Sequence, residues 1–213
     1  LGLVAARRVS DARREALNDT SFAVLCLPDD AAREAVALVD PASKTRIVDA
    51  SSAHRVADGW TYGFPEIIGR DRIAQAARVG NPGCYPTGFL GLVAPLVRAG
   101  LLAADWPLTV NAVSGFSGGG KALIERFEKE PDIAFRAYGL TLDHKHLPEM
   151  QVHAGLDHSV LFAPAVVPAF RGMLVEVPLH LGAMATEPSA DVLRDALADF
   201  YRDSPVVHVE RDT

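Results

Sequence analysis

The stretch SFAVLCLPDD, residues 21–30, decides the fold class, because an apolar run leads directly into a helix start. The run over residues 21–27 is short and almost wholly apolar, which is typical of a buried parallel strand. Asp29 and Asp30 then offer an N-cap for a helix over residues 31–39. The sequence therefore predicts a strand followed by a helix, as in an α/β protein.

A second strand is predicted over residues 45–50, so strand, helix and strand alternate. This spacing is typical of half of a doubly wound, Rossmann-like sheet, in which ligands bind at the carboxyl ends of the strands. Pro28 and Ser51 follow the two strands, and we predict that both contact a cofactor. Arg55 lies slightly beyond, where a guanidinium can hold an anionic group through two parallel hydrogen bonds.

The chain is predicted to divide near residue 80. Gly and Pro interrupt residues 56–80, which are expected to be irregular. Residues 1–80 are predicted to form a partial dinucleotide-binding domain, and residues 81–213 an α+β domain with a mixed sheet. The elements expected in the second domain are helices over 86–98, 122–129 and 189–201, strands over 107–113 and 206–209, and a hairpin of strands over 160–167 and 173–181.

Composition restricts the class of protein. The 213 residues are 49% hydrophobic and 23% charged with a net charge of −6, which is typical of a globular chain without a basic surplus for nucleic acid. No run of about 18 apolar residues is present, so we expect no membrane span. Two dissimilar cysteines fit a reducing compartment, which predicts a cytoplasmic protein.

Cys84 is the leading candidate for chemistry. It lies in the stretch NPGCYPTG, residues 81–88, where Gly83 permits a tight turn and the following segment looks helical. Unpaired amides and the helix dipole stabilise a thiolate at a helix N-terminus, and the thiolate is the nucleophilic form of cysteine. Cys26, inside the apolar run, is expected to be a small buried hydrophobe.

A second candidate is the stretch DHKHLPE, residues 143–149. Pro148 suits the first position of a helix, so residues 144–147 are predicted to be extended. His144 and His146 would then point to one side, roughly 6.5 to 7 Å apart. Such a pair serves as a general base or as part of a metal site, or is simply solvated. Because the spacing is not that of a helical metal pair, we predict no metal.

A third candidate is the glycine-rich loop SGFSGGGK, residues 114–121. Its successive small residues have amides that can converge on an oxyanion, a phosphate or the edge of a nicotinamide. We predict that Ser117 and Gly118 contact a cofactor. The alternative is a flexible connection with no ligand.

Taken together and in this order, the cysteine stretch, the glycine-rich loop and HKHLPE resemble the N-acetyl-γ-glutamyl-phosphate reductases of arginine biosynthesis. The stretch DASSAHR, residues 49–55, is similar to the shorter type of that family. The likeness covers nearly the whole chain, whereas the cysteine motif alone is shared in looser form with aspartate-semialdehyde dehydrogenase. Members of the family reduce an acyl phosphate to an aldehyde with NADPH and release phosphate.

The resemblance implies roles for individual residues. Cys84 attacks the acyl phosphate and forms a thioester, while His144, in preference to His146, shuttles the proton. Arg55, His146 and Glu149 bind the substrate, and amides of the glycine-rich loop hold the oxyanion. The resemblance also implies a homodimer or a homotetramer.

Two features of the family do not appear in this sequence. The family opens with a strand and a glycine-rich turn that cradles the cofactor pyrophosphate, and it ends with a glycine loop and a closing helix. We expect these parts to lie outside the present chain. Arg7 is predicted to meet the 2′-phosphate of NADP, or else to cap a solvated helix.

Three other interpretations stay open. The chain is alternatively an aspartate-semialdehyde dehydrogenase or another acyl-phosphate reductase. It is otherwise a cysteine hydrolase that uses Cys84 and His144, or a non-catalytic cofactor-binding or scaffold domain. Activity with N-acetylglutamate semialdehyde, with the aspartate analogue or without any cofactor distinguishes these classes.

Overall fold

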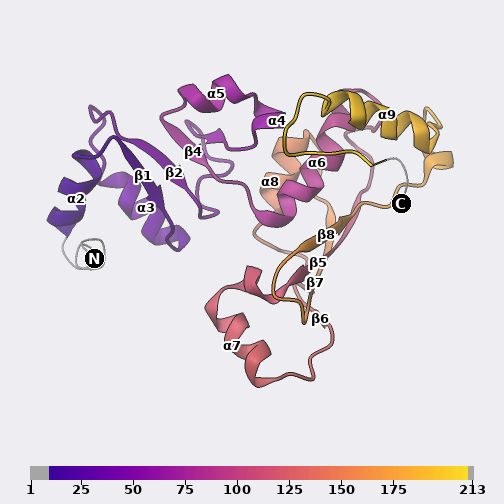
Figure 1. Cartoon of the computed structure of the whole chain (residues 1–213). Helices are drawn as coiled ribbons and strands as arrows, with labels where there is room; N and C mark the ends of the chain where they lie inside the picture. The colour runs from indigo at the N-terminus through magenta and orange to yellow at the C-terminus, as the bar shows by residue number, and fades with distance from the viewer. Residues whose placement is uncertain (1–9, 211–213) are drawn as a thin grey trace. The chain divides into compact units, whose positions relative to one another are not determined.

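The computed structural model describes residues 10–210 of the chain (Figure 1). The chain divides into two compact units, Leu1–Pro82 and Gly83–Thr213, here called the N-terminal and the C-terminal unit. Each unit is described by itself.

The N-terminal unit contains a parallel sheet with the strand order β1-β2-β4-β3. In β1 (Phe22–Leu25) and β2 (Arg46–Asp49), successive residues pair in parallel register, and α3 (Asp29–Ala37) connects the two strands. Strand β2 also pairs in parallel with β4 (Arg78–Gly80), and β4 with β3 (Thr61–Tyr62). The predicted strand, helix and strand of a doubly wound sheet are therefore confirmed.

Residues 56–80 are more regular than predicted. They contain β3, β4 and the short helices α4 (Pro65–Ile68) and α5 (Arg70–Gln75). Elements of two to six residues are too short to show a hydrophobic period, so their pattern is hidden in the sequence. Strand β4 forms because its main chain bonds to β2, with the Ile47 amide donating to Ala77 and the Asn81 amide to Asp49.

A helix that was not predicted, α2 (Ser10–Asn18), opens the described part of the N-terminal unit. It contributes Leu17 to a core that also contains Leu25, Val36 and Ile47. The start of α3 differs from the expectation as well. Pro28 is its N-cap and the structure gives no side-chain cap, because both carboxylate oxygens of Asp29 accept hydrogen bonds from Ser52 instead.

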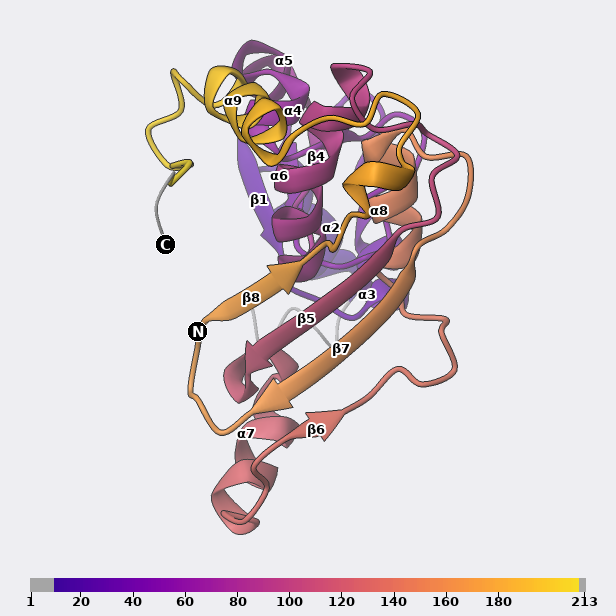
Figure 2. The same cartoon turned by 90° about the vertical axis from the view of Figure 1, so that its right-hand side faces the viewer.

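The C-terminal unit contains a mixed sheet with the order β6-β7-β5-β8, and Figure 2 shows β5 between β7 and β8. The strands are β5 (Thr109–Gly115), β6 (Arg136–Ala137), β7 (Leu161–Val167) and β8 (Met173–Glu176). Strand β5 runs parallel to β7 and antiparallel to β8. The predicted mixed sheet is confirmed, but the predicted hairpin of β7 and β8 is wrong.

The hairpin fails because β5 occupies the place between the two strands. The connecting loop, residues 168–172, crosses the end of β5 and bonds to it through main-chain groups. The amides of Gly115, Phe116 and Ser117 donate to the carbonyls of Gly172, Ala169 and Phe170, respectively. The turn residues of this loop suggest a hairpin, but the loop instead bonds to the end of a third strand, β5. The sequence of the loop does not reveal that partner.

The helices of the C-terminal unit begin where the sequence predicts or one to two residues earlier or later. They are α6 (Cys84–Arg98), α7 (Lys121–Lys129), α8 (Leu147–Ala154) and α9 (Ala190–Phe200), with short 3-10 turns η1 (Phe116–Gly119) and η2 (Leu181–Ala183). Helix α6 packs against α8, α9 and β8. Phe89, Leu90 and Val93 of α6 are buried in the core together with Phe162 of β7.

The strand predicted over residues 206–209 does not form. The hydroxyl oxygen of Ser204 accepts hydrogen bonds from the amides of Val206 and Val207, so local bonds replace a sheet ladder. Within residues 10–210, no helix is long and apolar enough to cross a membrane.

Candidate active site

Cys84 is the first residue of α6, as predicted. Gly83 before it is the extended N-cap, with φ −67° and ψ 152°. Its neighbour Tyr85 is buried, whereas Cys84 itself is exposed. The thiol therefore lies in solvent at the start of a fifteen-residue helix, the positive end of the helix dipole. Cys26 is also exposed, because it follows the end of β1, so the expectation that it is buried is wrong.

Glu149 holds the turn that precedes Cys84. Its side chain lies in the first turn of α8, is 1% exposed, and accepts a hydrogen bond from the Gly83 amide at 3.0 Å through Oε2. This contact gives a buried carboxylate a main-chain partner at the N-terminus of α6. Its role in substrate binding stays a prediction.

His144 and His146 lie in a turn, so the prediction of an extended segment is wrong. The Leu147 amide donates to the His144 carbonyl at 3.0 Å, and His146 has α-helical angles. Helix α8 begins at Leu147, with Pro148 one position inside. The two rings are consequently closer than predicted, with centroids 4.7 Å apart.

The His144 imidazole is held in its neutral form. Burial lowers its pKa, the neighbouring Lys145 lowers the pKa further, and Asp143 partly opposes them. Its Nδ1 atom accepts a hydrogen bond from the His146 amide at 3.2 Å, which leaves the proton of the neutral ring on Nε2. His146 is more deeply buried, at 6% exposed. Neutral His144 therefore has one hydrogen-bond donor, its Nε2–H, because Nδ1 already accepts from the His146 amide.

Three hydroxyl groups form a chain beside the two histidines. Tyr138 donates to the Tyr85 hydroxyl at 3.2 Å, and the Tyr85 hydroxyl lies 2.9 Å from the Ser114 hydroxyl. Burial and the hydrogen bond to Tyr85 raise the pKa of Tyr138, and the nearby Cys84 raises it further. Tyr138 also contacts His144, with ring centroids 5.8 Å apart. It therefore connects the surroundings of the cysteine to those of the histidine.

Sequence analysis missed Tyr85 and Ser114 as members of this site. Tyr85 follows Cys84 directly, and buried tyrosines usually find a hydrogen-bond partner, which is the one signal that pointed to it. Ser114 was noted only as the beginning of the glycine-rich loop.

The first amides of the glycine-rich loop are already bonded within the protein. The amides of Gly115, Phe116 and Ser117 are bonded to residues 169–172, so the predicted convergence of these amides on a ligand is wrong. A Cβ added at Gly118 would meet only the Ser114 hydroxyl, at 4.0 Å, so this position is open. Contact of Ser117 and Gly118 with a cofactor stays a prediction, supported at Gly118 by this open space.

In the N-terminal unit, Arg55 is 8% exposed and is bonded to the main chain. Its Nε donates to the Asn81 carbonyl at 2.9 Å and its Nη2 to the Ala50 carbonyl at 3.2 Å. The guanidinium thus ties the end of β2 to the residue after β4. Sequence analysis placed Arg55 at a strand end but did not predict these contacts.

A buried carboxylate organises the same turn. Asp49 is fully buried, and its Oδ2 lies 2.6 Å from Nδ1 of His54 and accepts from the Ser51 hydroxyl at 2.7 Å. His54 stacks on Trp60 with ring centroids 4.1 Å apart. The hydroxyl of Ser51 therefore already donates a hydrogen bond to Asp49.

Two other residues were predicted to contact the cofactor. Pro28, three residues after the end of β1, is exposed. Arg7 lies outside the described residues.

The parallel sheet fits a nicotinamide dinucleotide in its topology. The carboxyl ends of β1 and β2 lie at one edge, where such cofactors bind in doubly wound sheets. Among residues 10–210, no cluster of three or more His, Cys, Asp or Glu side chains could hold a metal ion.

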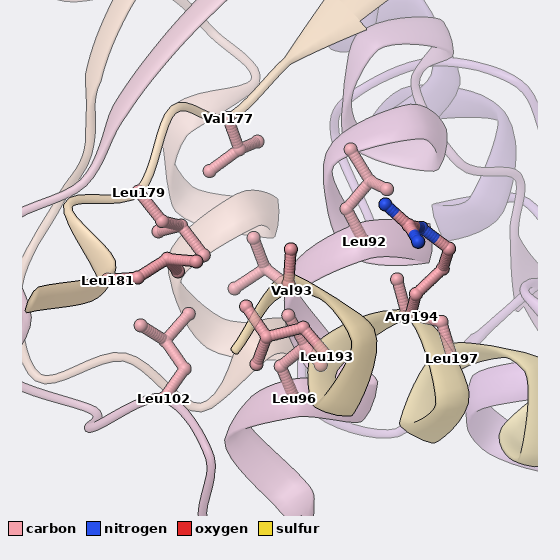
Figure 3. A pocket seen from close by; sticks show the side chains of 11 residues that line it. Leu92, Val93, Leu96, Leu102, Val177, Leu179, Leu181, Leu193, Arg194 and Leu197 are labelled. Carbon is pink, nitrogen blue, oxygen red and sulfur yellow. The ribbon is translucent and has the colours of Figure 1, made fainter. Parts of the chain in front are cut away.

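A pocket of the C-terminal unit is lined by none of these candidate residues. It has a volume of about 310 Å³ and lies between α6, α9 and residues 177–181, with Leu96 and Leu193 among its apolar lining (Figure 3). Arg194 is its charged member, and that guanidinium is bonded to Asp191 at 2.8 Å. An apolar pocket of this kind does not suit an acyl phosphate.

Comparison with known families gives two matches. Residues 4–76 match the NAD binding domain of semialdehyde dehydrogenases, and residues 84–213 match their dimerisation domain. An N-acetyl-gamma-glutamyl-phosphate reductase of Brucella ovis is 47% identical over 96% of this chain and 68% of its own length. N-acetyl-gamma-glutamyl-phosphate reductase 2 of a Nostoc strain is 47% identical over 95% of this chain and 66% of its own. The chain thus spans about two thirds of the length of these curated relatives.

Solved structures show the same fold at low identity. Aspartate semialdehyde dehydrogenase II of Vibrio cholerae superimposes with a TM-score of 0.58 at 16% identity, over 86% of this chain and 61% of that one. The enzyme from Francisella tularensis superimposes with a TM-score of 0.58 at 11% identity, over 88% of this chain and 65% of that one.

Proposed function

Because the chain belongs to the N-acetyl-γ-glutamyl-phosphate reductase family of semialdehyde dehydrogenases, we propose that it reduces N-acetyl-γ-glutamyl phosphate to N-acetylglutamate semialdehyde and phosphate, as a step of arginine biosynthesis. The observation that carries the proposal is the exposed Cys84 at the first residue of α6. The nucleophile, its supporting turn and both histidines belong to one compact unit.

Cys84 is the nucleophile in this proposal. Its thiolate attacks the acyl carbon of the substrate, a carbon–sulfur bond forms, and the bond to the phosphate oxygen breaks, so that inorganic phosphate leaves. Cys84 lies at the positive end of the α6 dipole, and the bond from Gly83 to Glu149 fixes the turn that holds it. A bound nicotinamide dinucleotide supplies the hydride that converts the thioester to the aldehyde level.

His144 moves the proton. In the neutral form of the ring, Nδ1, once it gives up the hydrogen bond from the His146 amide, accepts the thiol proton before the attack. The resulting imidazolium protonates the oxyanion of the thiohemiacetal. The imidazole takes that proton back as the thiohemiacetal collapses to the aldehyde, and returns it to the departing Cys84 thiolate. The lowered pKa of His144 favours this neutral form near pH 7. His146 is assigned to the substrate side, because it is more deeply buried beside the start of α8.

Substrate and cofactor contacts follow from the same family. We assign Arg55 to the phosphate of the substrate, and His146 with Glu149 to the rest of it. Pro28, Ser51, Ser117 and Gly118 are assigned to the cofactor, for which we propose NADP. The carboxyl-end position of Pro28 and the open space at Gly118 support this assignment.

A homodimer or a homotetramer is proposed for the assembly. The match to a dimerisation domain supports it, as do the exposed apolar side chains Phe135, Leu140 and Leu142 beside the sheet of the C-terminal unit. We assign the protein to the cytoplasm, in line with its exposed thiols, which need reducing conditions.

The decisive experiment is the reverse reaction of the protein. We expect reduction of NADP that depends on both phosphate and N-acetylglutamate semialdehyde. Activity with aspartate semialdehyde alone would move the chain to the neighbouring enzyme class. Ester or amide hydrolysis without a cofactor would favour a cysteine hydrolase, and cofactor binding without turnover would favour a scaffold domain.

A further inference from the structure

Tyr85 follows the proposed nucleophile and contacts both histidines of the candidate site. It is 3% exposed and immediately follows Cys84 in α6. Its hydroxyl lies 2.9 Å from that of Ser114 on β5, 3.3 Å from the Ala165 carbonyl on β7 and 3.2 Å from the Tyr138 hydroxyl. The first turn of α6 is thereby tied to two strands and to the segment after β6.

The ring of Tyr85 reaches the histidines as well. Its centroid lies 6.3 Å from that of His144 and 6.1 Å from that of His146, both in edge contacts. Phe162 lies 5.2 Å away on a further side. A shift of this ring therefore changes the space available to both imidazoles.

The hydroxyl of Tyr85 is an acceptor and a donor at once. It accepts from Tyr138, which stays protonated because burial raises its pKa, and it donates to Ser114 or to the Ala165 carbonyl. Deleting this one oxygen leaves the half-buried hydroxyls of Tyr138 and Ser114 and the buried Ala165 carbonyl without this partner, and an unsatisfied buried group costs more than the bond itself contributes.

From these contacts we propose that Tyr85 is a positioning residue, which sets Cys84 and His144 relative to each other through its hydroxyl. The proposal rests on the proposed function for the roles of those two residues. Tyr85 itself needs no contact with substrate or cofactor. Its effect is transmitted along one peptide bond to Cys84 and across the ring edge to His144.

Tyr201, the residue that follows α9, provides a matched control because it bonds to the same helix, α6. It is 4% exposed, and its hydroxyl donates to the Gly91 carbonyl of α6 at 2.7 Å. Tyr201→Phe thus deletes the same atom from a buried phenol that supports α6, two turns beyond Cys84. It controls for the general loss of a buried hydroxyl.

The first measurement needs no turnover. The rate of alkylation of Cys84 by iodoacetamide is measured by mass spectrometry against Cys26, which is exposed and serves as the internal reference. In Tyr85→Phe we expect the ratio to fall about threefold or more, because the thiolate loses its alignment with the helix amides. In Tyr201→Phe the ratio should stay at the wild-type value. An unchanged ratio in folded Tyr85→Phe overturns the proposal.

The second measurement uses turnover of the full chain. Tyr85→Phe should lower kcat about tenfold with KM changed less than about twofold, since alignment rather than binding is lost. Tyr85→Phe combined with Tyr138→Phe should be no slower than Tyr85→Phe alone, because the orphaned donor is removed as well. A rise in KM at constant kcat, or additive losses, contradicts the proposal.

The two measurements also separate the proposal from the proposed function. If the wild-type protein shows no reductase turnover but the alkylation ratio falls only in Tyr85→Phe, the positioning role stands and the proposed function fails. If Tyr85→Phe does not fold, Ser114→Ala removes one partner of the same hydroxyl and should lower the ratio in the same direction. A wild-type ratio in that variant overturns the positioning role.

Discussion

The turn after β2 and the turn before α6 handle polar groups in opposite ways. Around Asp49, charged side chains are turned inward, and both Asp49 and Arg55 are bonded to neighbouring side-chain or main-chain groups. Around Cys84, the thiol faces solvent, neutral hydroxyls and a neutral imidazole lie behind it, and the buried carboxyl group of Glu149 holds the turn. The first turn uses its buried charged side chains to hold its shape, whereas the second combines one buried carboxyl group with neutral groups beside the proposed nucleophile.

This difference shows how far the type of a polar residue predicts its role. An arginine after a strand suggests an anion site, yet Arg55 first serves the main chain around it. A cysteine after a glycine suggests a helix start, and α6 does begin at Cys84, although the Gly83 amide before it is bonded to the distant Glu149. Residue type predicts a role best when the partners are local.

The largest effect that would test this contrast comes from Cys84→Ser. We expect turnover to fall by about 10³-fold or more, because a serine hydroxyl at this position is a far weaker nucleophile than a thiolate. Cys26→Ser, a matched change at an exposed thiol, should leave turnover unchanged. Steady-state kinetics measure both variants. Near-normal turnover in Cys84→Ser would show that Cys84 is not the nucleophile, so the turn before α6 would lose the role that sets it apart from the turn after β2.

The next effect concerns stability in the other turn. Asp49→Ala should lower the free energy of unfolding by about 3 kcal/mol, since it leaves buried His54 and Ser51 without their shared acceptor. Asp40→Ala removes an exposed carboxylate that accepts one main-chain hydrogen bond, and it should cost about 1 kcal/mol or less. Urea unfolding measures the difference. Equal losses in the two variants would mean that the Asp49 network adds no stability of its own.

A smaller effect tests whether Arg55 also serves the substrate. Arg55→Ala should raise KM for phosphate in the reverse reaction by about tenfold, and Arg55→Lys should recover only part of it, because a lysine lacks the two-pronged geometry. The matched control is Arg46→Ala, whose guanidinium also donates to main-chain carbonyls but is exposed. An unchanged KM for phosphate in Arg55→Ala would leave that residue with its structural role alone.

The most subtle effect is a pH dependence. Because the pKa of His144 is lowered from 6.5, the acid limb of the rate profile should lie below pH 6.5, with activity rising as the imidazole loses its proton. His144→Asn should abolish this limb, whereas His146→Asn should retain it. The opposite pattern would exchange the two roles.

The lowered pKa of His144 also makes the stability of the fold depend on pH. The folded state binds the His144 proton less readily than the unfolded chain does, so stability is complete above pH 6.5 and is lost as the pH falls toward the lowered pKa. Thermal unfolding of wild type and His144→Asn across pH 5 to 7 measures this loss. A variant that loses as much stability as the wild type would contradict it.

Sequence reasoning succeeded where short-range rules decide the structure. The βαβ order of the N-terminal unit and the start of α6 follow from apolar runs and from Gly and Pro between them. It failed where a distant segment supplies the partner. Strand β5 enters between β7 and β8, Ser52 takes the carboxylate of Asp29, and residues 169–172 take the amides of the glycine-rich loop.

In the candidate site, too, local motifs were predictable from the sequence and contacts between distant segments were not. Cys84 and the two histidines are visible as motifs, but the turn geometry of the histidines depends on where α8 begins. The link from Tyr138 through Tyr85 to Ser114 joins three separate segments, and no local pattern announces it.

The hydrogen bond from Gly83 to Glu149 has a consequence for how the protein matures. It joins residues 66 positions apart, so the chain must close a long loop before the bond can form. During synthesis, Cys84 leaves the ribosome well before α8 exists, and its turn is not yet held. The thiol therefore acquires its aligned setting late, after most of the unit has been made. The turn of the proposed nucleophile is therefore completed only after the chain has been made as far as α8.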